Sequence, residues 1–341
     1  MKLGGFFKKK EKKDFLQEAD EYKRSGKYDK ALEAYADILA MDPGNLKAWY
    51  DKASIHLTLE QYLPALEAYE KVLELDPNNT KAWHEKAIVL VNLGRLDDAL
   101  TAYDNILISE PGNTRLLSEK ALILKELKKD NELLNVYESL LQIEPDNTKI
   151  WFEKGIMLTG LGKDADALAT YEKVLALEPG HAGALARKGI AVGSKKQYAE
   201  GFALLERALK IDPGNWNAWF GKGKVWGLKG SDLRALGMKY DAIKAFDTSL
   251  HAYEKAIELN PKNPALWYEK GFVLKSLNKG NEAIRAFEKS IEMDPRSTQA
   301  WYDKGIALKE LGRGDDARKC FEKVLDIDPA HTLARNKLKQ M

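Results

Sequence analysis

The chain has 341 residues, 44% of them hydrophobic, and its 54 Lys and Arg nearly balance its 52 Asp and Glu, for a net charge of +2 at pH 7. This balance gives no general reason to expect nucleic-acid binding, and no run approaches the roughly 18 apolar residues of a transmembrane helix. The one Cys excludes an internal disulfide framework and fits a reducing compartment, so we expect a soluble, cytoplasmic protein.

The chain begins with a basic segment, MKLGGFFKKKEKK, which holds six Lys and one Glu. Leu3 to Phe7 is too short for the apolar core of a signal peptide and precedes the lysines. We assign residues 1–11 to a basic N-terminal tail. Its two Phe beside a lysine run could touch an anionic membrane surface, where each basic residue contributes about 1 kcal/mol. The alternative is a solvated tail that leads into the first helix.

From residue 12 onward the sequence repeats with a period of 34 residues. The clearest copy, residues 298–331, has Trp301 at position 4, Gly305 at 8, Ala317 at 20, Phe321 at 24 and Pro329 at 32. A fixed period of this length is typical of a repeat solenoid. The position-32 prolines, with one longer step of 48 residues, are Pro43, Pro77, Pro111, Pro145, Pro179, Pro213, Pro261, Pro295 and Pro329.

Each period predicts a hairpin of two helices. Apolar or small residues at positions 4, 8 and 11 form one helical stripe, and those at 20, 24 and 27 form a second. Gly or Asn near positions 14 to 16 turns the chain, as at Gly94, Gly162 and Gly312, and the proline ends the unit. A small residue at position 8 lets the two helices approach closely. A single hairpin cannot cover its own apolar face, so the hairpins must stack.

This pattern resembles the tetratricopeptide repeat, and nine in-phase copies cover residues 12–331. The resemblance implies an all-α fold, an α-solenoid in which helix hairpins form a right-handed superhelix. Residues 332–341 begin another first helix and stop, which suits a partial C-terminal cap.

The seventh repeat, residues 216–263, carries 14 extra residues. One added heptad in each arm keeps two antiparallel helices in phase, so we predict an elongated hairpin that protrudes about 10 Å. The alternative is a disordered loop, because five Gly weaken the first helix by about 1 kcal/mol each. In the hairpin, Trp226, Leu233 and Leu236 are expected to face Ile243, Phe246 and Leu250.

One departure from the family pattern is systematic, because Lys stands at position 7 where the family usually has Leu. We expect each Lys stem to pack along the Trp three residues earlier. Acids just before the repeat prolines, such as Asp76 and Glu110, are expected to neutralise these lysines. The lysines are Lys52, Lys86, Lys120, Lys154, Lys188, Lys222, Lys270 and Lys304.

No constellation for catalysis is apparent, and we predict no enzyme activity, no cofactor and no metal site. The five His stand at different positions of the repeat, and no pair has the spacing of metal ligands. Two of them, His181 and His331, follow repeat prolines. Cys320 occupies a position that holds Ala in other repeats, so we expect it to be buried. The acids are expected to follow the solvent-facing phase of both helices.

In the family, the concave face is lined mainly by the first helix at positions 2, 5, 9 and 12. Apolar residues there are the expected footing for an extended segment or amphipathic helix of a partner protein. The alternative is that position 9 is half-covered by the neighbouring helix and completes the core. The predicted partner-binding residues at position 5 are Tyr50, His84, Phe152, Phe220, Tyr268 and Tyr302, and those at position 9 are Ile88, Leu122, Ile156, Ile190, Phe272 and Ile306.

Some members of the family hold a C-terminal chaperone tail with a carboxylate clamp, which needs Lys at position 5 and Asn at position 9. Here position 5 never holds Lys and position 9 never holds Asn. Acids stand at position 6 in the second to fifth repeats and would repel a carboxylate, so we do not expect chaperone-tail binding.

The sequence therefore predicts a non-enzymatic scaffold or adaptor that binds a partner protein segment with about micromolar affinity. Changing Phe152 and Tyr268 to Ala should weaken this binding and leave the melting temperature nearly intact. The alternative function is a membrane-surface or self-assembling structural protein, anchored by the N-terminal tail and forming a homo-oligomer through the elongated hairpin.

Overall fold

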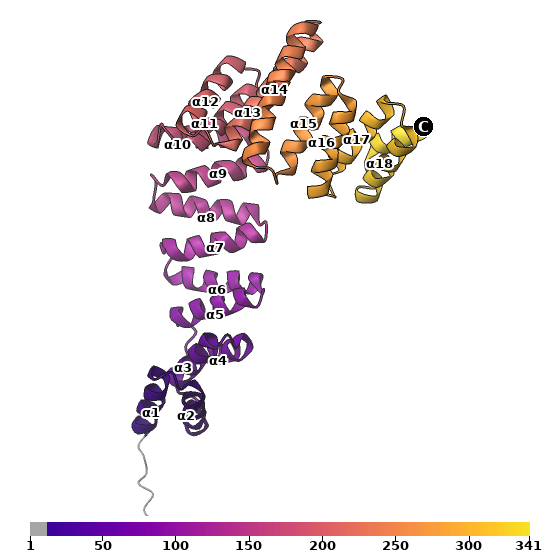
Figure 1. Cartoon of the computed structure of the whole chain (residues 1–341). Coiled ribbons are helices and arrows are strands. Elements are labelled where there is room, and N and C mark those ends of the chain that lie inside the picture. Colours follow the sequence, from indigo (N-terminus) through magenta and orange to yellow (C-terminus); the bar gives the residue numbers. More distant parts are fainter. Residues whose placement is uncertain (1–11) are drawn as a thin grey trace, which may run out of the picture. The chain divides into compact units, whose positions relative to one another are not determined.

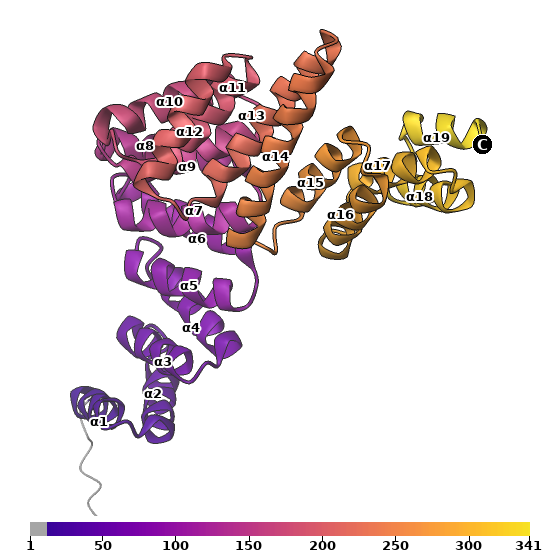
Figure 2. The ribbon, with the colours of Figure 1, turned by 45° about the horizontal axis from the view of Figure 1, so that its top comes forward.

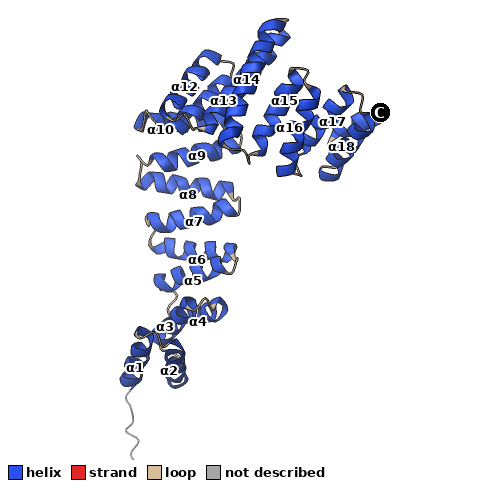
Figure 3. Ribbon diagram, in the orientation of Figure 1, coloured by secondary structure: helices blue, strands red, loops and turns tan. Residues whose placement is uncertain are grey.

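The computed structural model of the chain describes residues 12–341, in which every regular element is an α-helix (Figure 3). The predicted all-α solenoid class is confirmed. The described residues form two compact units, unit 1 up to Asn147 and unit 2 from Thr148 to Met341. The expected membrane contact of the tail concerns residues 1–11, which lie outside the described part of the chain.

Unit 1 is a stack of helices of 13 or 14 residues, joined by short turns (Figure 1). The helices are α1 (Lys12–Arg24), α2 (Tyr28–Met41), α3 (Leu46–Thr58), α4 (Tyr62–Leu75), α5 (Thr80–Asn92), α6 (Leu96–Ser109), α7 (Thr114–Glu126) and α8 (Asp130–Ile143).

Unit 2 continues the alternation and ends in the short helix α19, whose buried Ala334 shares a core cluster with Ala317 and Phe321 of α18 (Figure 2). Its helices are α9 (Thr148–Gly160), α10 (Asp164–Leu177), α11 (Ala182–Ser194), α12 (Tyr198–Ile211), α13 (Trp216–Ala235), α14 (Lys239–Leu259), α15 (Pro264–Ser276), α16 (Gly280–Met293), α17 (Thr298–Glu310), α18 (Gly314–Ile327) and α19 (Thr332–Lys339).

The core of most hairpins is an aromatic ring at position 24 that lies against the small residue at position 8; in the sixth hairpin Leu205 takes the place of the ring and lies against Gly189. A methyl group on Gly271 would come within 2.6 Å of the Phe287 ring, and one on Gly305 within 2.7 Å of the Phe321 ring. No Cβ atom tolerates such distances, so the expected close approach at position 8 is confirmed for these hairpins.

The turns and caps repeat with the same period. The turn residue at position 15 has a positive φ in both units, as in Gly94 and Gly162 at 70°. The following first helix is capped by the side chain just before it; for example, Asn79 Oδ1 accepts a hydrogen bond from the Ala82 amide at 3.0 Å. The position-4 Trp fixes the loop as well, since Trp83 Nε1 donates to the carbonyl of the repeat proline Pro77 at 2.8 Å.

The seventh hairpin is elongated, with 20 residues in α13 and 21 in α14, and it extends past its neighbours in unit 2 (Figures 1 and 2). Insertion of one heptad per arm therefore gives helix and not a disordered loop. Leu233, Phe246 and Leu250 share a core cluster, as expected.

Three of the expected contacts in this hairpin are wrong. Leu236 is 74% exposed and Ile243 50% exposed, and the Trp226 ring stacks on Phe202 at 4.4 Å. The reason is that glycines occupy much of the face of α13 that meets α14, beside Leu233. A methyl group on Gly230 would lie 2.9 Å from the Phe246 ring, and one on Gly223 2.8 Å from the Tyr253 ring.

No helix among the described residues is both long enough and apolar enough to cross a membrane.

Candidate partner-binding face

The predicted partner-binding residues lie on one face of the first helix of each hairpin, which we call the helix-A face and define by positions 2, 5, 6 and 9. All six position-5 residues are half-buried. Each meets the position-24 ring of its own hairpin at a centroid distance of 5.6 to 6.3 Å. They are therefore neither core residues nor freely solvated ones.

The position-9 residues divide into two groups. Leu122 is 69% exposed and Phe272 38% exposed. Ile190 and Ile306 are half-buried and pack against core clusters, so for these two the alternative of completing the core fits the contacts. Ile88 and Ile156 are also half-buried.

The acids at position 6 do not follow the solvent-facing phase, contrary to expectation. Glu119 is half-buried, and its carboxylate lies 3.0 Å from Nε2 of His84 and accepts hydrogen bonds from Tyr103 Oη at 3.1 Å and Arg115 Nε at 2.9 Å. In unit 2, Tyr268 Oη donates to Asp303 at 2.8 Å. In these two pairs, the position-6 acid of one repeat thus holds the position-5 side chain of the repeat before it.

Electrostatics differ between two of these acids. Burial raises the pKa of Glu119, but hydrogen bonds from Arg115, His84 and Tyr103 outweigh it and lower the pKa below its ordinary value of 4.5. For Glu269, burial is the dominant influence and raises the pKa above 4.5, although Lys224 and the Tyr253 hydroxyl oppose it. The fold therefore favours the charged form of Glu119 and disfavours the charged form of Glu269.

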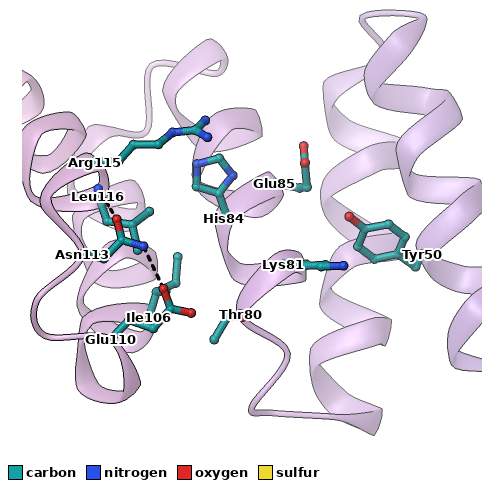
Figure 4. A pocket seen from close by; sticks show the side chains of 10 residues that line it. All are labelled: Tyr50, Thr80, Lys81, His84, Glu85, Ile106, Glu110, Asn113, Arg115 and Leu116. Atoms are coloured by element: carbon teal, nitrogen blue, oxygen red, sulfur yellow. Dashed lines mark hydrogen bonds between the residues drawn. The ribbon is translucent and has the colours of Figure 1, made fainter.

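A hollow of about 350 Å³ opens on the helix-A face of unit 1 (Figure 4). Tyr50, Lys81, His84, Glu85 and Arg115 line it from positions 2, 5 and 6 of α3, α5 and α7. Its floor includes the turn before α7, where Asn113 donates to Glu110 and caps Leu116. Two predicted site residues, Tyr50 and His84, therefore border the same hollow.

The lysines at position 7 behave as expected toward Trp, with Lys86 Nζ 5.3 Å from the Trp83 ring centre and Lys270 Nζ 5.8 Å from that of Trp267. The predicted acid partners are wrong. Lys86 pairs with Glu70 at 3.1 Å, and each of five later lysines pairs with the equivalent acid 16 residues earlier. The acids before the prolines instead bind the turn, as Asp76 accepts from Asn79.

His181 and His331 are helix caps, because Nδ1 of each accepts a hydrogen bond from the amide three residues later, at 3.1 and 3.2 Å. Cys320 is buried, as expected, and burial raises the pKa of its thiol. Among residues 12–341, no group of three His, Cys, Asp or Glu lies close enough together to hold a metal ion.

A second hollow, of about 370 Å³ in unit 2, was missed by the sequence analysis. Arg187, Lys195 and Lys224 line it together with the predicted residue Ile190. The sequence does contain a sign of this hollow, which is a change of charge at position 6. Arg187 stands there, whereas the second to fifth repeats have the acids Asp51, Glu85, Glu119 and Glu153.

Comparisons with known proteins agree with this architecture. Profiles of the tetratricopeptide repeat match residues 16–80, 154–216, 252–285 and 274–341, and a profile of the Psidin N-terminal TPR repeats region matches 53–153. Together these matches span 16–216 and 252–341. No curated protein matches the sequence.

Three solved structures share the fold at low sequence identity. A tetratricopeptide repeat protein from Parabacteroides merdae is 20% identical with a TM-score of 0.60, over 76% of this chain and 97% of that chain. The APC/C hetero-tetramer Cut9-Hcn1 is 14% identical with a TM-score of 0.59, over 91% and 58%. The human IFIT1 dimer with m7Gppp-AAAA is 15% identical with a TM-score of 0.57, over 97% and 80%. The repeat pattern, the stacked helices and the profile matches agree: the chain belongs to the tetratricopeptide repeat family.

Proposed function

We propose that this protein is a non-enzymatic scaffold that binds an extended segment or amphipathic helix of a partner protein on its helix-A face. The family fold is generally that of a protein-interaction scaffold, and one solved relative in fold, Cut9-Hcn1, is itself a complex of proteins. The finer statement, that the partner lies on the helix-A face, is our proposal.

The observation that carries the proposal is a set of aromatic side chains that are partly exposed and yet held in place. Tyr268 donates to Asp303, and its ring contacts Phe287 at a centroid distance of 5.8 Å. An aromatic ring that is already fixed loses little conformational entropy when a partner covers it. Such residues are typical anchors of protein interfaces.

Exposed apolar area on the same face supplies the second support. Phe272 lies on α15 one helical turn beyond Tyr268, and it is 38% exposed. Lys275 Nζ lies 5.4 Å from the Phe272 ring centre and pairs with Asp303 at 2.8 Å, so a single network joins these residues. A partner segment that covered Phe272 would bury apolar surface beside a polar rim.

The structure changes the choice of test residues. Phe152 and Tyr268 are half-buried; the Phe152 ring occupies space over Gly183, and Tyr268 packs on a core cluster. Replacing either with Ala removes packing as well as surface, so we expect the melting temperature to fall. Phe272 is the better probe because more of its ring is exposed.

The test is a selection from a random peptide library on the full chain, followed by fluorescence anisotropy with the best peptide. We expect Phe272→Ala to weaken peptide binding by about 2 kcal/mol, the size of an interface hot spot, with helical content unchanged. The matched control is Ile243→Ala, an exposed apolar residue of the same unit on α14. Equal losses in the two variants, or no selectable peptide, would remove the helix-A face as the binding surface.

A further inference from the structure

The cavity of about 370 Å³ in unit 2 is basic, unlike the hollow in unit 1. It lies among α9, α10, α11 and α13, and three cations, Arg187, Lys195 and Lys224, line it. Asp164 is the one carboxylate among its lining residues. The lining therefore carries an excess of two positive charges.

None of these cations forms a close ion pair within the described part of the chain, although Glu269 interacts electrostatically with Lys224 at longer range. No carboxylate oxygen there lies within 4 Å of Arg187, Lys195 or Lys224, and Nε of Arg187 is buried without a hydrogen-bond acceptor. Nearby lysines are different: Lys188 pairs with Glu172 at 2.8 Å, and Lys222 with Glu206 at 3.8 Å. A buried N–H group without an acceptor is costly, so the retention of Arg187 at this place points to an external anion.

The missing acceptor can be identified by comparison with other repeats. Tyr103 Oη donates to the position-6 acid Glu119 at 3.1 Å. In the equivalent place Tyr171 meets Arg187, and its hydroxyl pairs with Thr159 Oγ1 at 2.9 Å instead. The substitution of Arg for an acid thus removes the anion that this part of the helix-A face holds elsewhere.

From this geometry we propose that the cavity binds a carboxylate side chain of an acidic segment, with the Arg187 guanidinium and the Lys224 ammonium as its partners. The guanidinium presents paired N–H donors that match a carboxylate, and the volume accommodates an Asp or Glu side chain. Ile190 beside the cations supplies an apolar wall for the methylene groups. This inference rests on the proposed function, since it assigns the chemistry of the partner segment.

The test uses fluorescein-labelled deca-glutamate as the probe and the full chain as the receptor, with binding followed by fluorescence anisotropy. We expect the double variant R187Q/K224Q to bind the probe about thirtyfold or more weakly, the size expected when two hydrogen-bonded charge pairs are lost together. The matched control, K188Q/K222Q, removes the same charge from the same two helices outside the cavity, and we expect a change of less than about threefold.

Each other outcome counts against the inference. No binding of deca-glutamate by the unchanged chain, or an equal loss in both double variants, would overturn it. Tighter binding of a deca-glutamine peptide that carries one phosphoserine would assign the cavity to a phosphoryl group and overturn the carboxylate. A fall in the melting temperature of R187Q would show that the guanidinium stabilises the fold, whereas we expect it unchanged or raised.

The outcome for the proposed function remains separate. If library peptides bind and depend on Phe272 but not on Arg187 or Lys224, the helix-A face stands as the binding surface and only the acidic chemistry fails.

Discussion

The hairpins of unit 1 and unit 2 have different small residues at position 8, where the first helix contacts the position-24 side chain of the second. In unit 1 this residue carries a methyl group, and in unit 2 it does not, so that in unit 2 rings such as Tyr171 and Phe287 occupy the space where a methyl would lie. The change coincides with the boundary between the two units. The residues are Ala19, Ala53, Ala87 and Ala121 in unit 1, and Gly155, Gly189, Gly223, Gly271 and Gly305 in unit 2.

A second difference concerns position 6 on the helix-A face. In unit 1, Glu119 is satisfied by three donors, whereas in unit 2 the equivalent Arg187 has a buried Nε without an acceptor. Repeats with nearly the same backbone therefore differ in the charge that a ligand would need in order to bind at position 6. The difference teaches that function in such a chain is found where one repeat departs from the others.

The largest expected effect comes from making the two regions alike at position 6. Arg187→Glu should abolish deca-glutamate binding, a loss of about 2 to 5 kcal/mol, because a like charge replaces the proposed partner. The same variant supplies Tyr171 with an acceptor, as Glu119 does for Tyr103, so the melting temperature should not fall. Anisotropy and thermal unfolding of one sample measure both, and retained binding would contradict the comparison.

The next effect concerns position 8. Gly271→Ala should destabilise unit 2 by about 1 to 3 kcal/mol, because the new methyl would lie 2.6 Å from the Phe287 ring. The reverse change in unit 1, Ala87→Gly, should cost about 1 kcal/mol through helix propensity. Urea unfolding followed by circular dichroism measures both; a stabilised Gly271→Ala variant would show that the ring has room to move.

Two carboxylates should respond to pH with opposite signs. The pKa of Glu119 is lowered in the fold, so its stabilising contribution is present above pH 4.5 and is lost as the pH falls through the lower folded value. The pKa of Glu269 is raised, so its contribution is full below pH 4.5 and is lost as the pH rises through the folded value.

Gln variants at these two positions test this difference by thermal unfolding across pH. At pH 7, Glu119→Gln should be less stable than the unchanged chain by about 2 kcal/mol, the size of one hydrogen bond to a charged group. Glu269→Gln should be more stable than the unchanged chain at pH 7, and this gain should shrink as the pH falls through the raised folded pKa of Glu269 and be gone below pH 4.5. Parallel pH profiles for both variants would contradict the assignment.

The smallest effect is that of a helix cap in unit 2. His181→Ala should cost about 1 kcal/mol, because Nδ1 accepts the Ala184 amide at 3.1 Å, and His181→Asn should restore the cap as Asn45 and Asn79 provide it in unit 1. Thermal unfolding of the pair is sufficient; equal stability of the Ala and Asn variants would exclude a capping role.

The period alone predicts the fold because proline, the position-15 turn and the small residue at 8 are local devices that recur with every hairpin. The contacts inside the elongated hairpin were not predictable in this way. Gly230 entered the prediction only among five glycines that weaken the first helix, yet its role depends on Phe246 of the other arm, whose ring occupies the space where a methyl group would lie. The acids of position 6 were predicted to face solvent. This prediction was wrong because the side chains that hold them lie in the preceding repeat, which a single helix pattern does not show.

The candidate face was predictable in position and not in detail. Tyr50 and His84 border a hollow, whereas Ile190 and Ile306 pack against core clusters. The basic cavity was not predicted, because Arg187 is informative only by contrast with the acids that stand at position 6 in other repeats.

The central claim is that a partner segment lies on the helix-A face, and site-specific photo-crosslinking tests it most directly. A benzophenone amino acid in place of Phe272, irradiated with the library-selected peptide bound, should give a crosslinked product. The same group in place of Tyr240, which is 81% exposed on the elongated hairpin, should give none. Crosslinking from position 240 and not from position 272 would contradict the claim and assign binding to the hairpin.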